Sequence, residues 1–129
     1  MSQIIIPSMR SQRRPLWERC YGLCEVTGRP LQYETFDMHH RRPKGKGGTS
    51  RPNVNDLDNL LALDPTIHNG ARHSVHQDPG WSRPRGYLVS KTLDNPGMVP
   101  VYLLDRYWVL LGKDGVYYPL PKGARPAGV

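Results

Sequence analysis

Large and polar residues alternate over residues 33–39, and this period of two predicts a half-buried strand that ends at His40. Leucines gather over residues 56–63 and indicate a second short strand or turn. Residues 68–76 predict a short helix, because Asp64-Pro65-Thr66 supplies an N-cap side chain and an early proline, and a proline and a glycine follow the segment. The expected order is therefore strand, loop, strand, helix.

The pattern changes after Trp81, where β-forming residues dominate. Runs of such residues occupy 86–90, 99–104 and 107–111, and the turn residues 112–115 join the last run to Val116-Tyr-Tyr118 as a hairpin. These runs predict a small β appendage behind the helix. The predicted fold class is α+β, with a C-terminal β-hairpin.

The two ends of the chain contain little apolar periodicity. Residues 1–15 predict a basic, irregular arm, and Pro and Gly in residues 119–129 predict a fraying tail. We therefore expect an arm over 1–15, a core over 16–90, and a β appendage with its tail over 91–129. The isoleucines at 4–6 are too few for a signal peptide or a membrane span, so we expect a cytoplasmic protein without membrane contact.

Composition narrows the class of protein further. With 129 residues the chain is long enough for one domain, and its 13 Gly and 13 Pro disfavour a long helical bundle. The formal net charge is +7, and residues 1–51 carry ten basic against four acidic side chains. This charge makes a polyanion a candidate partner.

All five histidines lie in one stretch, residues 39–76, which directs the search for chemistry there. Side chains alternate along a strand, so adjacent His39 and His40 point to opposite sides. One can bind a metal ion while the other faces a substrate. We assign the metal to His39 and the role of general base to His40, because an unperturbed imidazole accepts a proton near neutral pH. His68 can close the site from the other side.

The pattern resembles the HNH endonucleases, the ββα-metal nucleases, and particularly their small phage-type members. Three segments carry the resemblance, over about residues 20–90: Asp37-Met-His-His-Arg-Arg-Pro-Lys-Gly-Lys-Gly-Gly48, Asp58-Asn-Leu-Leu-Ala-Leu63 and Ile67-His68. The resemblance implies a ββα-metal core in which His39 and His68 bind the metal and His40 is the general base. It gives Asn59 a role as metal ligand or as the residue that fixes the loop orienting His40.

The resemblance also implies an activity, hydrolysis of DNA phosphodiester bonds with one divalent metal ion. Histidine ligands suit Zn, Ni or Mn, and Mg remains open as the ion used in the cell. Two other interpretations stay open. The chain can be a nucleic-acid-binding module in which the metal is only structural, or an accessory subunit that acts with phage DNA-packaging (terminase) proteins, in the cytoplasm of the host cell.

A basic, glycine-rich loop follows His40, and its side chains are expected to contact DNA phosphates. Arg72, one helical turn after His68 in the expected helix, is a further candidate for the scissile phosphate. The residues expected to bind nucleic acid are Arg41, Arg42, Lys44, Lys46, Arg51 and Arg72.

The two cysteines, Cys20 and Cys24, depart from the paired Cys-x-x-Cys motifs that many HNH proteins use for a structural zinc. Two thiols supply only half of a tetrahedral zinc site, so we expect buried, reduced cysteines. His73 and His76 are possible additional ligands. The five-residue spacing from His68 places His73 off the ligand face of a helix.

Overall fold

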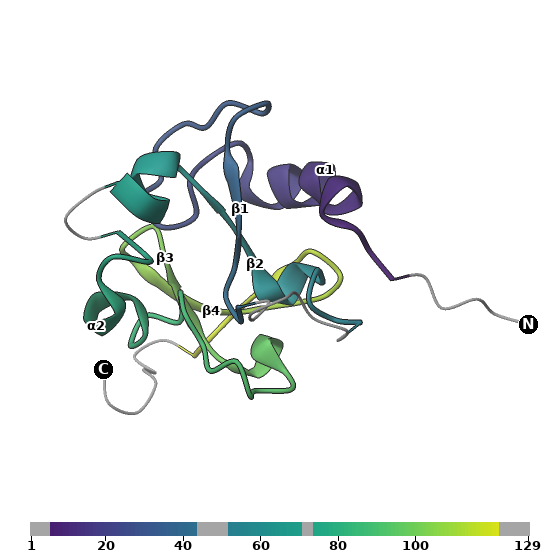
Figure 1. Cartoon of the computed structure of the whole chain (residues 1–129), viewed down its shortest axis with the longest axis vertical. Coiled ribbons are helices and arrows are strands. Elements are labelled where there is room, and N and C mark those ends of the chain that lie inside the picture. Colours follow the sequence, from purple (N-terminus) through teal and green to yellow (C-terminus); the bar gives the residue numbers. More distant parts are fainter. Residues whose placement is uncertain (1–5, 44–51, 71–73, 122–129) are drawn as a thin grey trace, which may run out of the picture.

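Two small antiparallel sheets and a few short helices form the fold in the computed structural model, which describes residues 6–43, 52–70 and 74–121 (Figure 1). The strands are β1 (Asp37–His40), β2 (Leu60–Leu63), β3 (Val101–Leu103), β4 (Tyr107–Leu111) and β5 (Tyr117–Pro119). β1 pairs with β2, and β4 lies between β3 and β5. The α+β class is confirmed, as are the second strand and the C-terminal hairpin.

Residues 9–15 are helical, so the expected irregular arm over residues 1–15 is wrong from Met9 onward. They belong to α1 (Met9–Cys20), which begins at a capping box in which Ser8 and Ser11 bond each other's backbone N–H groups. One face of α1 is buried through Leu16 and Cys20, four residues apart. Tertiary packing therefore stabilises a segment whose polar composition suggests disorder.

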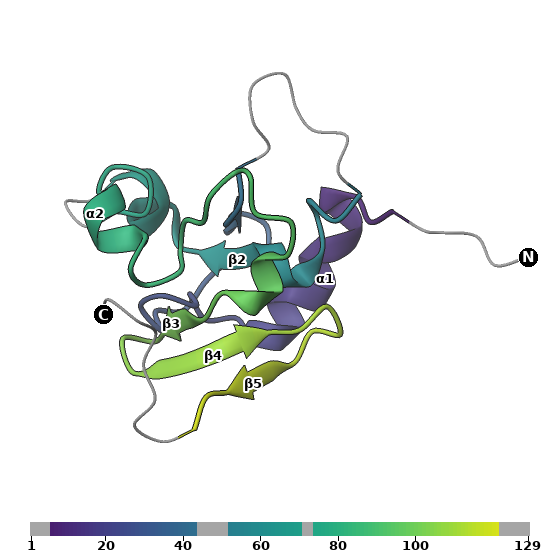
Figure 2. The same ribbon diagram turned by 90° about the horizontal axis from the view of Figure 1, so that it is seen from below.

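β2 is the most deeply buried element, and its alternating side chains join two hydrophobic clusters. Leu60 and Ala62 pack with Leu16 and Cys20 of α1, whereas Leu61 and Leu63 pack with the three-stranded sheet. Figure 2 shows β2 between that sheet and the rest of the fold. The expected β appendage therefore shares one continuous core with the segment that holds the histidines.

The remaining helical elements are single turns, η1 (Leu57–Asn59), η2 (Thr66–Gly70), α2 (Pro79–Ser82) and η3 (Pro96–Met98). The described residues do not form the expected continuous helix over 68–76. Residues 74–77 lie in coil and a turn, and the backbone N–H groups of Val75 and His76 donate to the carbonyls of Ile67 and His68 in η2. These hydrogen bonds hold the two described segments together.

Residues 86–90 do not form a strand, contrary to expectation, although residues 86–89 are buried. Gly86 has a φ of +80°, and a β-carbon there would clash with the carbonyl oxygen of Pro100. Its carbonyl accepts a hydrogen bond from Arg41, and the Val89 N–H donates to the Arg41 carbonyl. The segment is thus held by side-chain and loop contacts.

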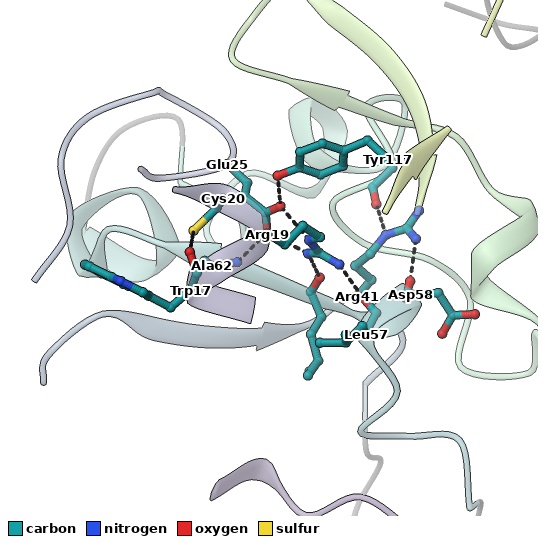
Figure 3. A network of polar contacts seen from close by, with 11 residues as sticks. Trp17, Arg19, Cys20, Glu25, Arg41, Leu57, Asp58, Ala62 and Tyr117 are labelled. Carbon is teal, nitrogen blue, oxygen red and sulfur yellow. Dashed lines mark hydrogen bonds and ion pairs between the residues drawn. The ribbon is translucent and has the colours of Figure 1, made fainter. Parts of the chain in front are cut away.

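A buried ion pair ties α1 to the loop that follows it (Figure 3). Arg19 donates two hydrogen bonds to Glu25, at 2.7 and 2.9 Å, and both side chains are 1% exposed. The Glu25 carboxylate also accepts from the Ala62 N–H and the Tyr117 hydroxyl. One carboxylate therefore connects α1, β2 and β5.

Cys20 and Cys24 are buried free thiols, as the sequence predicted. Desolvation raises the pKa of Cys20 to about 11, so this thiol stays protonated near neutral pH. None of the helices in the described part of the chain combines the length and apolar character that a bilayer span needs.

Candidate metal centre

Three histidines from three parts of the fold converge on one point. His39 lies near the end of β1, His68 in η2, and His76 in the turn over residues 75–77, which is hydrogen-bonded to η2. The Nε2 atom of His68 is 3.2 Å from Nδ1 of His39 and 3.0 Å from Nε2 of His76. One nitrogen of each ring lies within 4.8 Å of the other two. This group can hold a metal ion.

The outer nitrogens of two rings are fixed by acceptors. Nε2 of His39 donates to the Tyr87 carbonyl at 2.6 Å, and Nδ1 of His68 donates to the Asp37 carboxylate at 2.9 Å. In the neutral rings these hydrogens leave Nδ1 of His39 and Nε2 of His68 as lone pairs that face each other. Two facing lone pairs repel unless a cation lies between them. The hydrogen bonds therefore prepare both atoms for metal binding, as carboxylate and carbonyl partners do at known metal sites.

Burial lowers the pKa of two of the three rings, His39 and His76. Desolvation lowers the pKa of His39 to about 3, against a smaller opposing effect of its hydrogen bond to Tyr87, and the neighbouring His68 and His76 lower it further. Desolvation and the charge of His68 also lower the pKa of His76. Neutral imidazole is the metal-binding form, so His39 needs no proton release to bind a cation near pH 7.

The spacing of the nitrogens suits a first-row divalent ion. With metal–nitrogen bonds of about 2.0–2.1 Å, two nitrogens on a tetrahedral zinc ion are about 3.3 Å apart. Two of the three nitrogen pairs, at 3.2 and 3.0 Å, are close to that value, and the third pair lies within 4.8 Å. Three ligands leave coordination positions for other groups, and His76 is exposed to solvent whereas His39 is buried. The all-nitrogen donor set favours Zn or Ni over Mg.

Asn59 is not a ligand in this group, which corrects one of its two expected roles. Its side chain is fully buried, accepts from the Arg42 N–H at 2.8 Å, and donates to the Val54 carbonyl at 2.8 Å. These bonds join the chain leaving β1 to the chain entering η1. These hydrogen bonds agree with the other role expected for Asn59, which is to fix the loop after His40.

His40 lies outside the three-histidine group, and its ring is held by a different contact. Asn55 donates through Nδ2 to the carbonyl of Pro7, which can only accept, so Oδ1 of Asn55 faces His40. Nε2 of His40 therefore donates to Asn55, at 2.8 Å. In the neutral ring Nδ1 is then the basic nitrogen.

Arg41 and Arg42 are buried, so the expectation that they contact DNA phosphates is wrong for both. Arg41 donates to four backbone carbonyls, those of Gly86, Asp58, Pro96 and Val99. Arg42 donates to the carbonyls of Leu93 and Asp94 and to the Asn53 side chain. Their guanidinium groups therefore hold loops against the core through hydrogen bonds. Lys44, Lys46, Arg51 and Arg72 lie outside the described residues.

His76 is the residue whose role the sequence left open. On a continuous helix, a residue eight positions after His68 is two turns away and cannot share its metal ion. Hydrogen bonds from the backbone N–H groups of Val75 and His76 to the carbonyls of Ile67 and His68 bring the two rings together, with centroids 4.7 Å apart. No local sequence pattern indicates these contacts between residues eight positions apart.

Asp37→Asn tests whether the carboxylate behind His68 tunes the site. We expect metal affinity to fall about 10- to 100-fold, because the amide removes the charge that raises the basicity of the His68 ring. Calorimetric titration with Zn²⁺ measures the change. Glu34→Gln, which neutralises an exposed carboxylate outside the group, is the control and should leave the affinity unchanged. Equal affinities for the wild type and Asp37→Asn would exclude this role.

Comparison with known proteins adds no relative, so the functional interpretation of this centre depends on its geometry alone. No protein-family model, no curated protein and no solved structure matches the chain.

Proposed function

We propose that the chain is a metal-dependent endonuclease of the HNH type, which hydrolyses phosphodiester bonds in DNA. The observation that carries this proposal is the convergence of His39, His68 and His76, with hydrogen-bonded partners that direct two of their lone pairs to one point. A purely structural metal site is normally closed by four protein ligands. Three ligands and an exposed side at His76 favour a catalytic site.

The order of elements supports the ββα-metal assignment. β1 and β2 form an antiparallel pair, and η2 follows β2 and supplies His68. His39 pairs with Leu61 in the register, so the first ligand and the strand leading to the second lie side by side. Asn59 holds the loop between the two strands, consistent with the role that the HNH resemblance implies for it.

A divalent cation bound at this group supplies Lewis-acid stabilisation of the charge that develops on the phosphate and on the leaving oxygen. The remaining task is removal of a proton from the attacking water. We assign that task to Nδ1 of His40, because the hydrogen bond to Asn55 fixes the hydrogen on Nε2. His40 is the last residue of β1 and is partly exposed.

The charge of the chain supports a nucleic acid as substrate. The net charge is +7, and Arg10 and Arg14, four residues apart on α1, are exposed. Arg13 between them is engaged with the carbonyls of Tyr33 and Phe36. We therefore assign phosphate contacts to Arg10 and Arg14 in place of Arg41 and Arg42.

Cleavage of supercoiled plasmid DNA tests the proposal. The wild type should convert the plasmid to nicked or linear forms with Mn²⁺, Ni²⁺, Zn²⁺ or Mg²⁺, and excess EDTA should stop the reaction. His40→Ala should lower the rate about 100-fold or more while metal and DNA binding persist, because only the base is lost. Intact plasmid at every metal concentration, with metal bound, would show a structural metal site. Near-wild-type cleavage by His40→Ala would assign the base elsewhere.

A further inference from the structure

An apolar cavity of about 540 Å³ opens between the end of α1 and the β3–β5 sheet, formed by other residues than the three histidines. Its walls are aliphatic and aromatic, and include Leu23, Leu103, Tyr107, Val109, Tyr117 and Leu120. Arg19 and Glu25 also line the cavity, and both oxygens of the Glu25 carboxylate are hydrogen-bonded (Figure 3). Because these charges compensate each other, the cavity suits an uncharged, apolar group.

Two residues at the rim combine exposed apolar side chains with an unfavourable backbone. Tyr21 has a φ of +54° and is 89% exposed, and Leu104 has a φ of +56° and is 39% exposed. The left-handed region costs a non-glycine residue about 1 kcal/mol or more, and Asn or Gly are the usual residues there. Tyr21 is the C-cap of α1, and Leu104 is the first of two consecutive residues with positive φ in the β3–β4 hairpin loop, where Asn and Gly are favoured. Neither side chain is needed in the core, which makes the rim of the cavity a candidate functional surface.

The charge at the rim is positive. Arg106 is exposed, lines the cavity, and places its guanidinium 5.6 Å from the centre of the Tyr107 ring. Arg19 is neutralised by Glu25, so Arg106 is left to attract an anionic group beside the apolar one. β5 lies at the sheet edge, but Pro119 and Pro121 there lack N–H groups. Side-chain insertion is therefore favoured over the addition of a strand.

We propose that this cavity docks another protein, which inserts one aromatic or branched aliphatic side chain flanked by carboxylates. An apolar cavity with exposed apolar residues beside it matches protein interfaces, in which a buried anchor side chain is surrounded by further contacts. Tyr21 and Leu104 add exposed apolar surface that a partner protein can cover and that a small molecule inside the cavity would leave exposed. The proposal is independent of the metal centre, since no histidine of that group lines the cavity.

Binding of labelled peptides to the full chain, followed by fluorescence anisotropy, tests the proposal. The probe is Gly-Asp-Glu-Phe-Asp-Glu-Gly, and its controls carry Ala in place of Phe or Lys in place of each acidic residue. We expect the probe to bind at least tenfold more tightly than either control. Arg106→Ser should reduce the preference for the acidic peptide over the lysine peptide. Equal binding of the Phe and Ala peptides would overturn the proposal.

Asparagine variants separate docking from folding. Tyr21→Asn and Leu104→Asn should each weaken probe binding at least fivefold and raise the midpoint of thermal unfolding, because asparagine tolerates the left-handed backbone. Met98→Asn, at an exposed apolar residue outside the cavity, should change neither. A lower midpoint with unchanged binding in Leu104→Asn would assign the residue to packing and overturn the proposal.

Two further measurements exclude other occupants. Concentration-dependent dimerisation in sedimentation, abolished by Leu104→Asn, would assign the cavity to a second copy of the chain. Probe binding that appears only after deletion of residues 122–129 would assign it to the chain's own segment. Either result would overturn the proposal, and a monomer that binds the probe with or without these residues supports it.

Discussion

Replacement of His68 by alanine should lower metal affinity roughly 100-fold or more, the largest effect expected for any single ligand. Nε2 of His68 is the central atom of the group, within 3.2 Å of His39 and 3.0 Å of His76. Without His68, only one nitrogen of His39 and one of His76 remain to bind the ion, and the atom that lies close to both of them is lost. Calorimetry with Zn²⁺ and Ni²⁺ gives the affinity and the stoichiometry.

His40→Ala is the matched control, because it removes a histidine next to the group but outside it. It should retain one bound ion with nearly wild-type affinity. His39→Ala and His76→Ala should both weaken binding, and the exposed His76 should contribute less than the buried His39. Unchanged affinity and stoichiometry in His68→Ala would remove the metal centre from the account.

Glu25→Ala should destabilise the fold by about 3–5 kcal/mol, because it leaves Arg19 as a buried charge without its partner. The Ala62 N–H and the Tyr117 hydroxyl lose their acceptor in the same substitution. Chemical denaturation measures the free energy of unfolding. This loss is a large part of the stability of a typical domain, so the variant can be largely unfolded.

Tyr117→Phe tests the role of the Glu25 carboxylate in a variant that is expected to stay folded. It removes one hydrogen bond to the Glu25 carboxylate and should cost about 1–3 kcal/mol while the protein stays folded. Tyr118→Phe, at an exposed neighbour on the same strand, is the control and should cost less. A change below 0.5 kcal/mol in Glu25→Ala, a rough limit for surface substitutions, would contradict the structural role of the ion pair.

Local patterns in the sequence predict the sheet that carries His39 because its signals are short-range. Alternation over residues 33–39 and the leucines around Leu61 indicate β1 and β2, although residues 33–35 form a turn and β1 begins only at Asp37. α1 is missed because its apolar face is narrow, with Leu16 and Cys20 among arginines, and its stability comes from packing against β2. The capping pair Ser8 and Ser11 is a local sequence signal for the start of α1, although the polar composition of the segment suggests disorder.

Local patterns in the sequence cannot predict the burial of Arg41 and Arg42. A basic pair beside a candidate general base suggests a phosphate-binding surface. The acceptors of Arg41 include the carbonyls of Gly86 and Val99, which are 45 and 58 residues away along the chain. Only the three-dimensional arrangement shows that these carbonyls satisfy a buried guanidinium group. The same reasoning applies to His76, whose place beside His68 depends on backbone hydrogen bonds between residues eight positions apart.

The dependence of DNA cleavage on metal concentration tests most directly whether the three-histidine centre is the site of nuclease activity. Cleavage should reach half its maximal rate at the metal concentration that half-fills the site in calorimetry. Asp37→Asn should shift both values by the same factor, because Asp37 acts on the metal through His68. Cleavage that saturates at an unrelated concentration, or that stays unchanged in Asp37→Asn while metal binding weakens, would contradict the proposed function.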